Sequence, residues 1–218
     1  MNHKEIIYLT ENFVKANLQN AEGGHDWLHT ERVRKMALYI SEKENSDNFI
    51  VELAALLHDI ADAKFHNGDE NIGPQKAKEF LKTLNVNEKI ISEVENVVRY
   101  VSFKSENNLY KNKTKEFLVV QDADRLDAMG AIGIARAFNY GGFKNREMYN
   151  PEIKPNLNMS KEEYKKSNAP TINHFYEKLL LLKNLMNTDT AKLIAEQRHQ
   201  FMEIFLEQFY NEINLIKI

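Results

Sequence analysis

Cysteine is absent from the 218-residue chain, which excludes disulfide bonds and metal sites built on thiolate ligands. Any metal ion must therefore be held by histidine, carboxylate or amide side chains, and a cysteine-free chain suits a reducing cytoplasm. Glycine and proline are scarce, with 8 and 4 residues, which favours long helices and short loops over a many-stranded sandwich. No run of about 18 apolar residues predicts a transmembrane helix, and the N-terminus lacks the apolar core of a signal peptide. We expect a soluble, cytoplasmic protein.

A strong charge of either sign is also missing. The formal net charge of −3 gives no global positive field that would attract duplex nucleic acid, so double-stranded DNA or RNA is not expected as a partner. Hydrophobic residues make up 43% of the chain, which is enough for a sizeable core. Because no repeat, low-complexity tract or shift in composition marks a boundary, we expect a single domain over residues 1–218.

Apolar residues recur at helical spacing through most of the chain and predict an all-α fold. The expected helices cover about residues 6–18, 26–40, 49–60, 74–84, 87–101 and 116–138, followed by two C-terminal helices within residues 172–218. Residues 139–170 lose this periodicity and contain Gly141-Gly142 and three of the four prolines. Because this stretch is too long for a simple connector, we interpret it as an irregular lid inserted in a single helical bundle.

The dipeptide His58-Asp59 is the most informative feature that is present. It ends the apolar run VELAALL at residues 51–57, so it should lie on a buried helix. A buried imidazole and a buried carboxylate are costly unless each has a partner or an ion. This pair therefore predicts a metal site.

Further ligands are available in two other segments. His25 and His29 are four residues apart, although His25 should lie at the start of its helix. Three aspartates occur within the segment DADRLD: Asp122, Asp124 and Asp127. On a helix, Asp122 and Asp124 diverge by about 200°, whereas Asp124 and Asp127 share a face, so the three carboxylates cannot all reach one ion.

In order and spacing, these motifs resemble the H…HD…D signature of the HD-domain metal-dependent phosphohydrolases. The matching residues are His29 in GHDWLHTERV, His58-Asp59 in LLHDIAD and Asp124 in DADRLDA, within about residues 20–140. The continuation through GAIGIARAFNYGG and TINHFYEKLLLL is similar to a bacterial subgroup of HD hydrolases of comparable length. The resemblance implies that His29, His58, Asp59 and Asp124 hold one divalent ion, for which Mn, Fe, Co, Ni, Mg and Zn are all acceptable.

The resemblance also implies roles for residues near these ligands. Asp62 stands where relatives carry an acidic residue that orients the attacking water. Lys64 and His66 have two possible roles. Both are solvated loop residues, or Lys64 pairs with a substrate phosphate and His66 gives a proton to the leaving group. Asp127, one turn after Asp124, is suited to accept the N–H of a ligand imidazole.

Four residues are candidates for substrate binding. His25 contacts the helix start or the ligands, or touches the substrate directly, while Asp26 is suited to cap the helix that carries His29. Arg125 serves a salt bridge or packing, or neutralises phosphate charge. His174 and Lys178 are four residues apart on one helix face after the lid, where they either face solvent or reach the phosphates.

The predicted function is therefore metal-dependent hydrolysis of a phosphate ester or anhydride in a small molecule, most simply a nucleotide. The subgroup resemblance suggests nucleoside triphosphate pyrophosphohydrolysis first, with manganese as a suitable ion. Nucleotide phosphomonoesterase or phosphodiesterase activity would use the same ligands. A nucleotide-sensing domain without turnover would show a degraded ligand set, and a purely structural bundle would leave His58-Asp59 unexplained. The oligomeric state stays open, a homodimer included.

Overall fold

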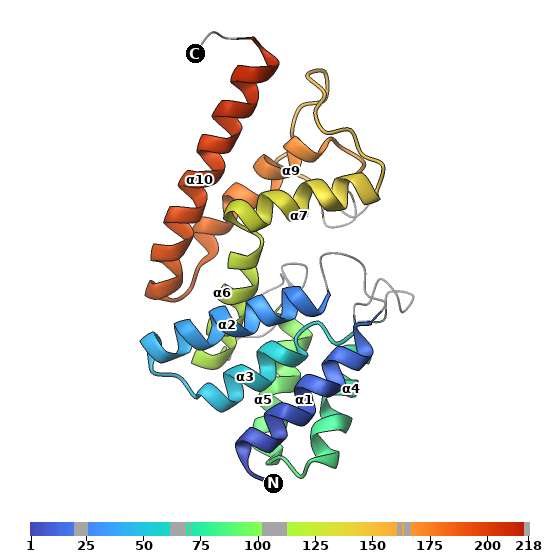
Figure 1. Cartoon of the computed structure of the whole chain (residues 1–218), viewed down its shortest axis with the longest axis vertical. Helices are drawn as coiled ribbons and strands as arrows, with labels where there is room; N and C mark the ends of the chain where they lie inside the picture. Colours follow the sequence, from blue (N-terminus) through green and yellow to red (C-terminus); the bar gives the residue numbers. More distant parts are fainter. Residues whose placement is uncertain are drawn as a thin grey trace. The chain divides into compact units, whose positions relative to one another are not determined.

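The computed structural model describes residues 1–19, 26–61, 69, 71–101, 113–160, 163 and 167–215. All regular structure in these ranges is helical, which confirms the predicted all-α class (Figure 1). The chain falls into two compact units, Met1–Asp124 and Arg125–Ile218, whose boundary lies inside helix α6 (Lys115–Asp127). The expected single domain over residues 1–218 stays a prediction. None of the described helices has both the length and the apolar composition that crossing a bilayer requires.

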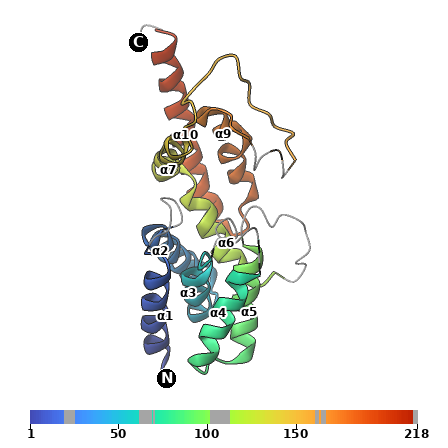
Figure 2. The same ribbon diagram turned by 90° about the vertical axis from the view of Figure 1, so that its right-hand side faces the viewer.

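The first unit is built around α3 (Asn48–Leu57). This helix packs against α1 (His3–Asn17), α2 (Trp27–Glu44) and α5 (Glu88–Tyr100), and α4 (Ile72–Thr83) packs against α5 (Figures 1 and 2). Most of α3 is apolar and completely buried, because helices cover it on several sides. The apolar run that precedes His58-Asp59 in the sequence therefore lies on a buried helix, as predicted.

Side-chain caps fix where several helices begin. The carboxylate of Asp26 accepts a hydrogen bond from the His29 N–H at 2.8 Å, which confirms its predicted role as the N-cap of α2. Asn2, Asp47 and Asn87 cap α1, α3 and α5 in the same way, and Thr188 caps α10 (Asp189–Ile213). Each such cap stabilises a helix by about 1 kcal/mol and sets its first residue.

The predicted helix over residues 116–138 is wrong, because the structure contains two helices there. Helix α6 ends at Asp127, and α7 runs from Gly130 to Phe143. Met129 is extended, and Gly130 has a φ of 68°, a left-handed conformation that costs a glycine little. Apolar residues continue through the break because both helices bury an apolar side, so periodicity alone does not reveal it.

The second unit contains α7, α9 (Thr171–Glu177), the 3₁₀ helix η3 (Leu179–Leu185) and α10 (Asp189–Ile213). Helix α10 packs against α7 and η3, and α9 packs against both of those elements as well (Figure 2). Aromatic rings of α7, α9 and α10 contact one another in this unit: Phe138, Phe175, Phe205 and Phe209. The first of the two expected C-terminal helices is divided at Lys178, and the expected break near residues 187–190 is present.

The predicted lid over residues 139–170 begins later than expected. Helix α7 continues to Phe143, so the irregular stretch starts at Lys144. Its described parts are tied to α9, since Thr171 N donates to Glu147 O at 2.9 Å and Asn173 Nδ2 donates to Ile153 O at 2.9 Å. These hydrogen bonds hold the described part of this segment against its own unit.

Candidate metal centre

The four predicted ligands lie on or directly after helices α2, α3 and α6. His29 lies in the first turn of α2, where the Asp26 cap fixes its backbone. His58 and Asp59 follow the last turn of α3, and His58 keeps helical dihedral angles of −55° and −33°. Asp124 lies on α6 near its C-terminal end.

The potential ligand atoms of these residues lie within a few ångströms of one another. The Nε2 atoms of His29 and His58 are 3.2 Å apart. Asp59 Oδ2 lies 3.5 Å from the first and 3.7 Å from the second of these nitrogens. Asp124 Oδ1 lies 3.6 Å and 3.9 Å from the same two atoms. Each of the two nitrogens therefore lies within 3.9 Å of both carboxylate oxygens.

Burial differs between the two kinds of ligand. The His29 and His58 side chains are each 1% exposed, whereas those of Asp59 and Asp124 are 20% and 27% exposed. The imidazoles therefore close the inner side of the cluster. The carboxylates lie at its outer side, where solvent or a substrate has access.

The hydrogen bond of His58 decides which of its nitrogens faces the cluster. Nδ1 lies 2.8 Å from the carbonyl oxygen of Ala55, and a carbonyl can only accept, so Nδ1 carries the proton. In the neutral ring, Nε2 then presents a lone pair toward His29, Asp59 and Asp124. A backbone carbonyl that holds an imidazole in this way is the usual support of a metal-binding histidine.

The cluster fits a divalent cation in its distances and its charge. Atoms bound at about 2.1 Å to one ion lie about 3.0–3.4 Å apart in octahedral or tetrahedral arrangements. The separations of 3.2–3.9 Å need only small movements to reach that range. Two ionised carboxylates and two neutral imidazoles carry a charge of −2, which a divalent ion offsets.

The three aspartates of this segment have different surroundings. Asp124 directs its carboxylate toward both histidines, as described above. Asp122 is completely buried, so it offers no open side to an incoming substrate. Asp127 accepts a 2.6 Å hydrogen bond from Arg136 and is 5% exposed. Its predicted role as an acceptor for a ligand imidazole stays a prediction.

The remaining predicted residues fall into two groups. His25, Asp62, Lys64 and His66 lie outside the described residues. Arg125 donates from Nη1 to the carbonyl of Leu185 within the second unit, a contact that suits the packing alternative. Its role in substrate binding stays a prediction.

His174 and Lys178 lie in the second unit, at α9 and directly after it. Burial, together with the positive charges of Lys178 and Arg146, lowers the pKa of His174 to about 3. Arg146 escaped the sequence analysis because it lies in the irregular segment, far from His174 along the chain. No motif marks it, and only the fold brings its charge close to His174.

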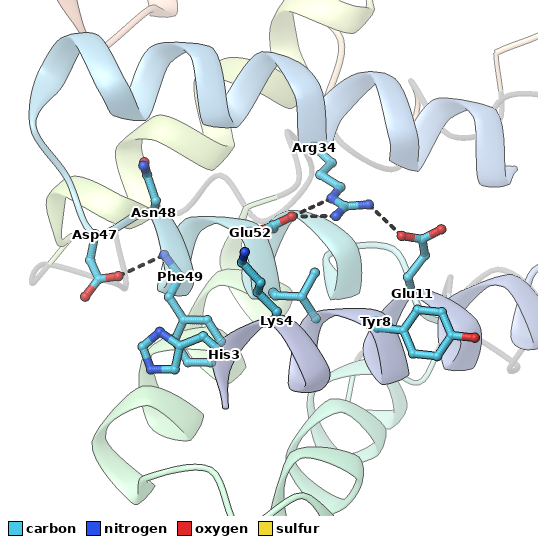
Figure 3. Close-up of a pocket in the computed structure, with 10 residues that line it drawn as sticks. His3, Lys4, Tyr8, Glu11, Arg34, Asp47, Asn48, Phe49 and Glu52 are labelled. Atoms are coloured by element: carbon cyan, nitrogen blue, oxygen red, sulfur yellow. Dashed lines mark hydrogen bonds and ion pairs between the residues drawn. The ribbon is translucent and has the colours of Figure 1, made fainter. Parts of the chain in front are cut away.

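A surface groove of about 590 Å³ lies elsewhere in the first unit, between α1, α2 and α3 (Figure 3). It contains none of the four potential ligands. Arg34 lines this groove, with Nε 2.9 Å from Glu52 Oε1 and Nη1 2.9 Å from Glu11 Oε2. The guanidinium is therefore paired on both sides, and the groove marks an ionic brace that joins the helices of His29 and His58.

Comparison with known proteins gives consistent matches over nearly the whole chain. A model of the family described as HD domain matches residues 27–129. The Bacillus subtilis protein YpgQ is 39% identical over 202 residues, which is 92% of this chain and 90% of YpgQ.

Solved structures give the same result. An HD-superfamily hydrolase from Bacillus thuringiensis has a TM-score of 0.77 and 46% identity, covering 98% of this chain and 99% of its own. The crystal structure of YpgQ in complex with ADP has a TM-score of 0.77 and 35% identity, with 97% of each chain covered.

Proposed function

This chain belongs to the HD-domain superfamily of metal-dependent phosphohydrolases, and we propose that it hydrolyses nucleotides, acting first on nucleoside triphosphates. The observation that carries the nucleotide proposal is the ADP bound in the crystal of its relative YpgQ. Because 97% of each chain aligns, a binding site in YpgQ has a counterpart region here. The proposed reaction adds water at the α-phosphorus and breaks the α–β anhydride bond, so a nucleoside monophosphate and pyrophosphate are released.

We assign the metal ligands to His29, His58 and Asp59, whose potential ligand atoms all lie within 4.8 Å of one another, and to Asp124, whose Oδ1 lies 3.6 and 3.9 Å from the two imidazole nitrogens. When bound, such an ion supplies a Lewis acid for a phosphoryl oxygen and acidifies water near neutral pH. We expect manganese to serve well, with Fe, Co, Ni and Mg as alternatives, since oxygen and imidazole ligands accept all of them.

The protein's own side chains would complete the site. The Ala55 carbonyl keeps the His58 ring in its ligating orientation. Asp62 would orient water, His66 would give a proton to the leaving group, and Lys64 would pair with a phosphate. Phosphate charge would also be offset by Arg125 and Lys178, with His25 and His174 as further polar contacts. Asp127 would support a ligand imidazole.

A panel of nucleotides assayed with several divalent ions tests this proposal. We expect nucleoside triphosphates to yield pyrophosphate and nucleoside monophosphate in equal amounts, and chelation to stop the reaction. Separate measurement of orthophosphate distinguishes the alternatives, because a phosphomonoesterase releases orthophosphate from monophosphates. Nucleotide binding without any product would instead favour a sensing domain and would overturn the proposal.

A further inference from the structure

Arg34 of α2 forms ion pairs with carboxylates of two other helices of the first unit (Figure 3). Its Nε and Nη2 donate to Glu52 Oε1 of α3 at 2.9 and 2.5 Å, and its Nη1 donates to Glu11 Oε2 of α1 at 2.9 Å. The three side chains are only 19–25% exposed, so solvent screens these pairs less than it screens pairs on an open surface. A planar guanidinium that spans two carboxylates fixes the spacing of the helices that carry them.

Helix α1 contacts α2 at a second point, one turn further along α1. Lys15 Nζ lies 2.5 Å from Glu11 Oε1 and 4.5 Å from the centre of the ring of Trp27, the first residue of α2. An ammonium at this distance from an aromatic ring is attracted to the face of the ring. Hydrogen bonds from Lys15 and Arg34 lower the pKa of Glu11, so the carboxylate that links the two contacts is ionised at neutral pH.

Both contacts hold the side of α2 that is turned away from His29. At about 100° per residue, Trp27 and Arg34 share one side of the helix, and His29 lies about 140–160° around the helix from them. Rotation of α2 by about 10° would move a side-chain atom about 6 Å from the helix axis by about 1 Å. Because the Nε2 atoms of His29 and His58 are 3.2 Å apart, such a movement would spoil their fit to one ion.

We propose that Arg34 is a positioning residue of the candidate metal centre, because it holds α2 on α1 and α3 and thereby keeps His29 at the distance from His58 that one divalent ion requires. Glu52 lies on α3, which leads directly into His58, so the Arg34–Glu52 pair joins the two helices that deliver the imidazoles. The inference rests on the proposed metal ligands. Arg34 acts through His29 and not by contact with the ion or the substrate.

Titration of the metal-free full-length protein with Mn²⁺, followed by electron paramagnetic resonance of the ion, tests this role. Arg34→Gln and Glu52→Gln should both weaken Mn²⁺ binding by about 3- to 10-fold, less than the loss of about 10- to 100-fold expected for a residue that hydrogen-bonds a ligand directly. The two variants remove charges of opposite sign. A purely electrostatic effect would therefore strengthen Mn²⁺ binding in Arg34→Gln and weaken it in Glu52→Gln.

Glu95→Gln is the matched control for Glu52→Gln. Glu95 accepts from Lys78 of α4 and from Arg99 of its own helix α5, and its side chain is 20% exposed, against 19% for Glu52. The two carboxylates thus have similar pairing and burial, but α4 and α5 carry none of the four proposed ligands. Glu95→Gln should change the affinity for Mn²⁺ by less than about 2-fold, as a screened distant charge does.

The visible absorption of bound Co²⁺ separates positioning from a loss of stability. This spectrum reports the geometry of the ligands, so it should change in Arg34→Gln and Glu52→Gln and stay unchanged in Glu95→Gln. A general loss of stability would leave the spectrum of the folded protein as it is. If Arg34→Gln does not fold, Arg34→Lys takes its place, because lysine keeps the charge but cannot span both carboxylates, and the same weakening is expected.

Opposite changes of Mn²⁺ affinity in Arg34→Gln and Glu52→Gln, unchanged affinity in both, or an equal loss in Glu95→Gln would overturn the proposal. A wild type that binds no divalent ion would overturn the metal centre and the role of Arg34 together. A wild type that binds one ion but hydrolyses no nucleotide would refute the proposed function and leave the positioning role standing.

Discussion

At the scale of single residues, Asp124 and Asp122 lie two positions apart on α6 but have different surroundings. Asp124 lies within 3.9 Å of both histidine Nε2 atoms and is partly exposed, whereas Asp122 is completely buried. A helix turns by about 100° per residue, so two carboxylates that are two positions apart point in different directions and cannot bind the same ion. The two positions therefore form a natural pair for testing the metal ligand.

Replacing Asp124 by asparagine should lower the affinity for the divalent ion by more than about 100-fold, because an anionic ligand is lost. Asp122→Asn should retain the ion, and its main effect should be on stability, since it alters a buried polar group. Metal content after dialysis, together with circular dichroism for folding, measures both. Preferential metal loss in Asp122→Asn would mean that the wrong carboxylate was assigned.

His174 should make stability depend on pH. Its pKa is 6.5 in the unfolded chain and about 3 in the folded protein, so the unfolded state binds the proton more readily. Stability is therefore retained above pH 6.5 and lost as pH falls toward 3. Because the residue keeps some exposure, we expect a loss of about 1–2 kcal/mol by pH 4.5.

Urea unfolding at pH 7.0 and 4.5 measures this loss. His174→Asn should show a smaller drop between the two pH values than the wild type. His3→Asn is the control, because His3 is exposed and stacks on Phe49, and it should keep the full drop. The same pH dependence in wild type and His174→Asn would contradict the assignment.

The residues that could be predicted from the sequence lie in short motifs, whereas the residue that was missed lies in no recognisable motif. His29, His58, Asp59 and Asp124 lie in short motifs, so order and spacing were enough to select them as candidate ligands. Arg146 carries no local signal. Its charge acts on His174 because the folded chain brings the two residues close together, although they are distant in the sequence.

At the scale of elements, the helices of the first unit were predictable because caps and apolar spacing agree. The break between α6 and α7 was not, since its cause is one backbone conformation at Gly130. A methyl group there would lie 3.1 Å from Arg198 Cγ, in addition to the left-handed strain.

Gly130→Ala should therefore destabilise the protein by about 1–2 kcal/mol. Gly142→Ala is a sharp control, because this glycine lies in α7 and a methyl group there meets nothing within 4 Å. That change should be neutral or should stabilise by up to about 1 kcal/mol, since alanine favours helix. Urea unfolding at pH 7 measures the free energy of unfolding of both variants. Equal effects would exclude the left-handed backbone conformation of Gly130 as the cause.

At the scale of the whole molecule, an ion that binds only the folded chain must raise its stability. At 100 times its Kd, one ion adds about 2.7 kcal/mol. Manganese should therefore raise the Tm of the wild type, and chelation should reverse the rise. Asp59→Ala should lose this response and the hydrolytic activity while keeping its helicity. Asp69→Asn, at an exposed carboxylate, should behave as the wild type.

A metal-dependent rise in Tm in Asp59→Ala equal to that of the wild type would place the ion elsewhere. If Asp59→Ala loses helicity, Asp59→Asn takes its place in the comparison with the wild type, because asparagine preserves the shape of the side chain. Activity without any effect of ions on Tm in the wild type would contradict a resident metal.

Helix α6 is anchored along the chain at closely spaced points. Phe117 is buried, Gln121 Nε2 donates to Val101 O at 3.3 Å, and Asp124 reaches the histidines. Inserting one residue between Gln121 and Asp124 would rotate that carboxylate by about 100° away from its partners. Between Gln121 and Asp124, an insertion or deletion is therefore more damaging than most substitutions. Relatives that keep the same metal ligands should align over this stretch without gaps.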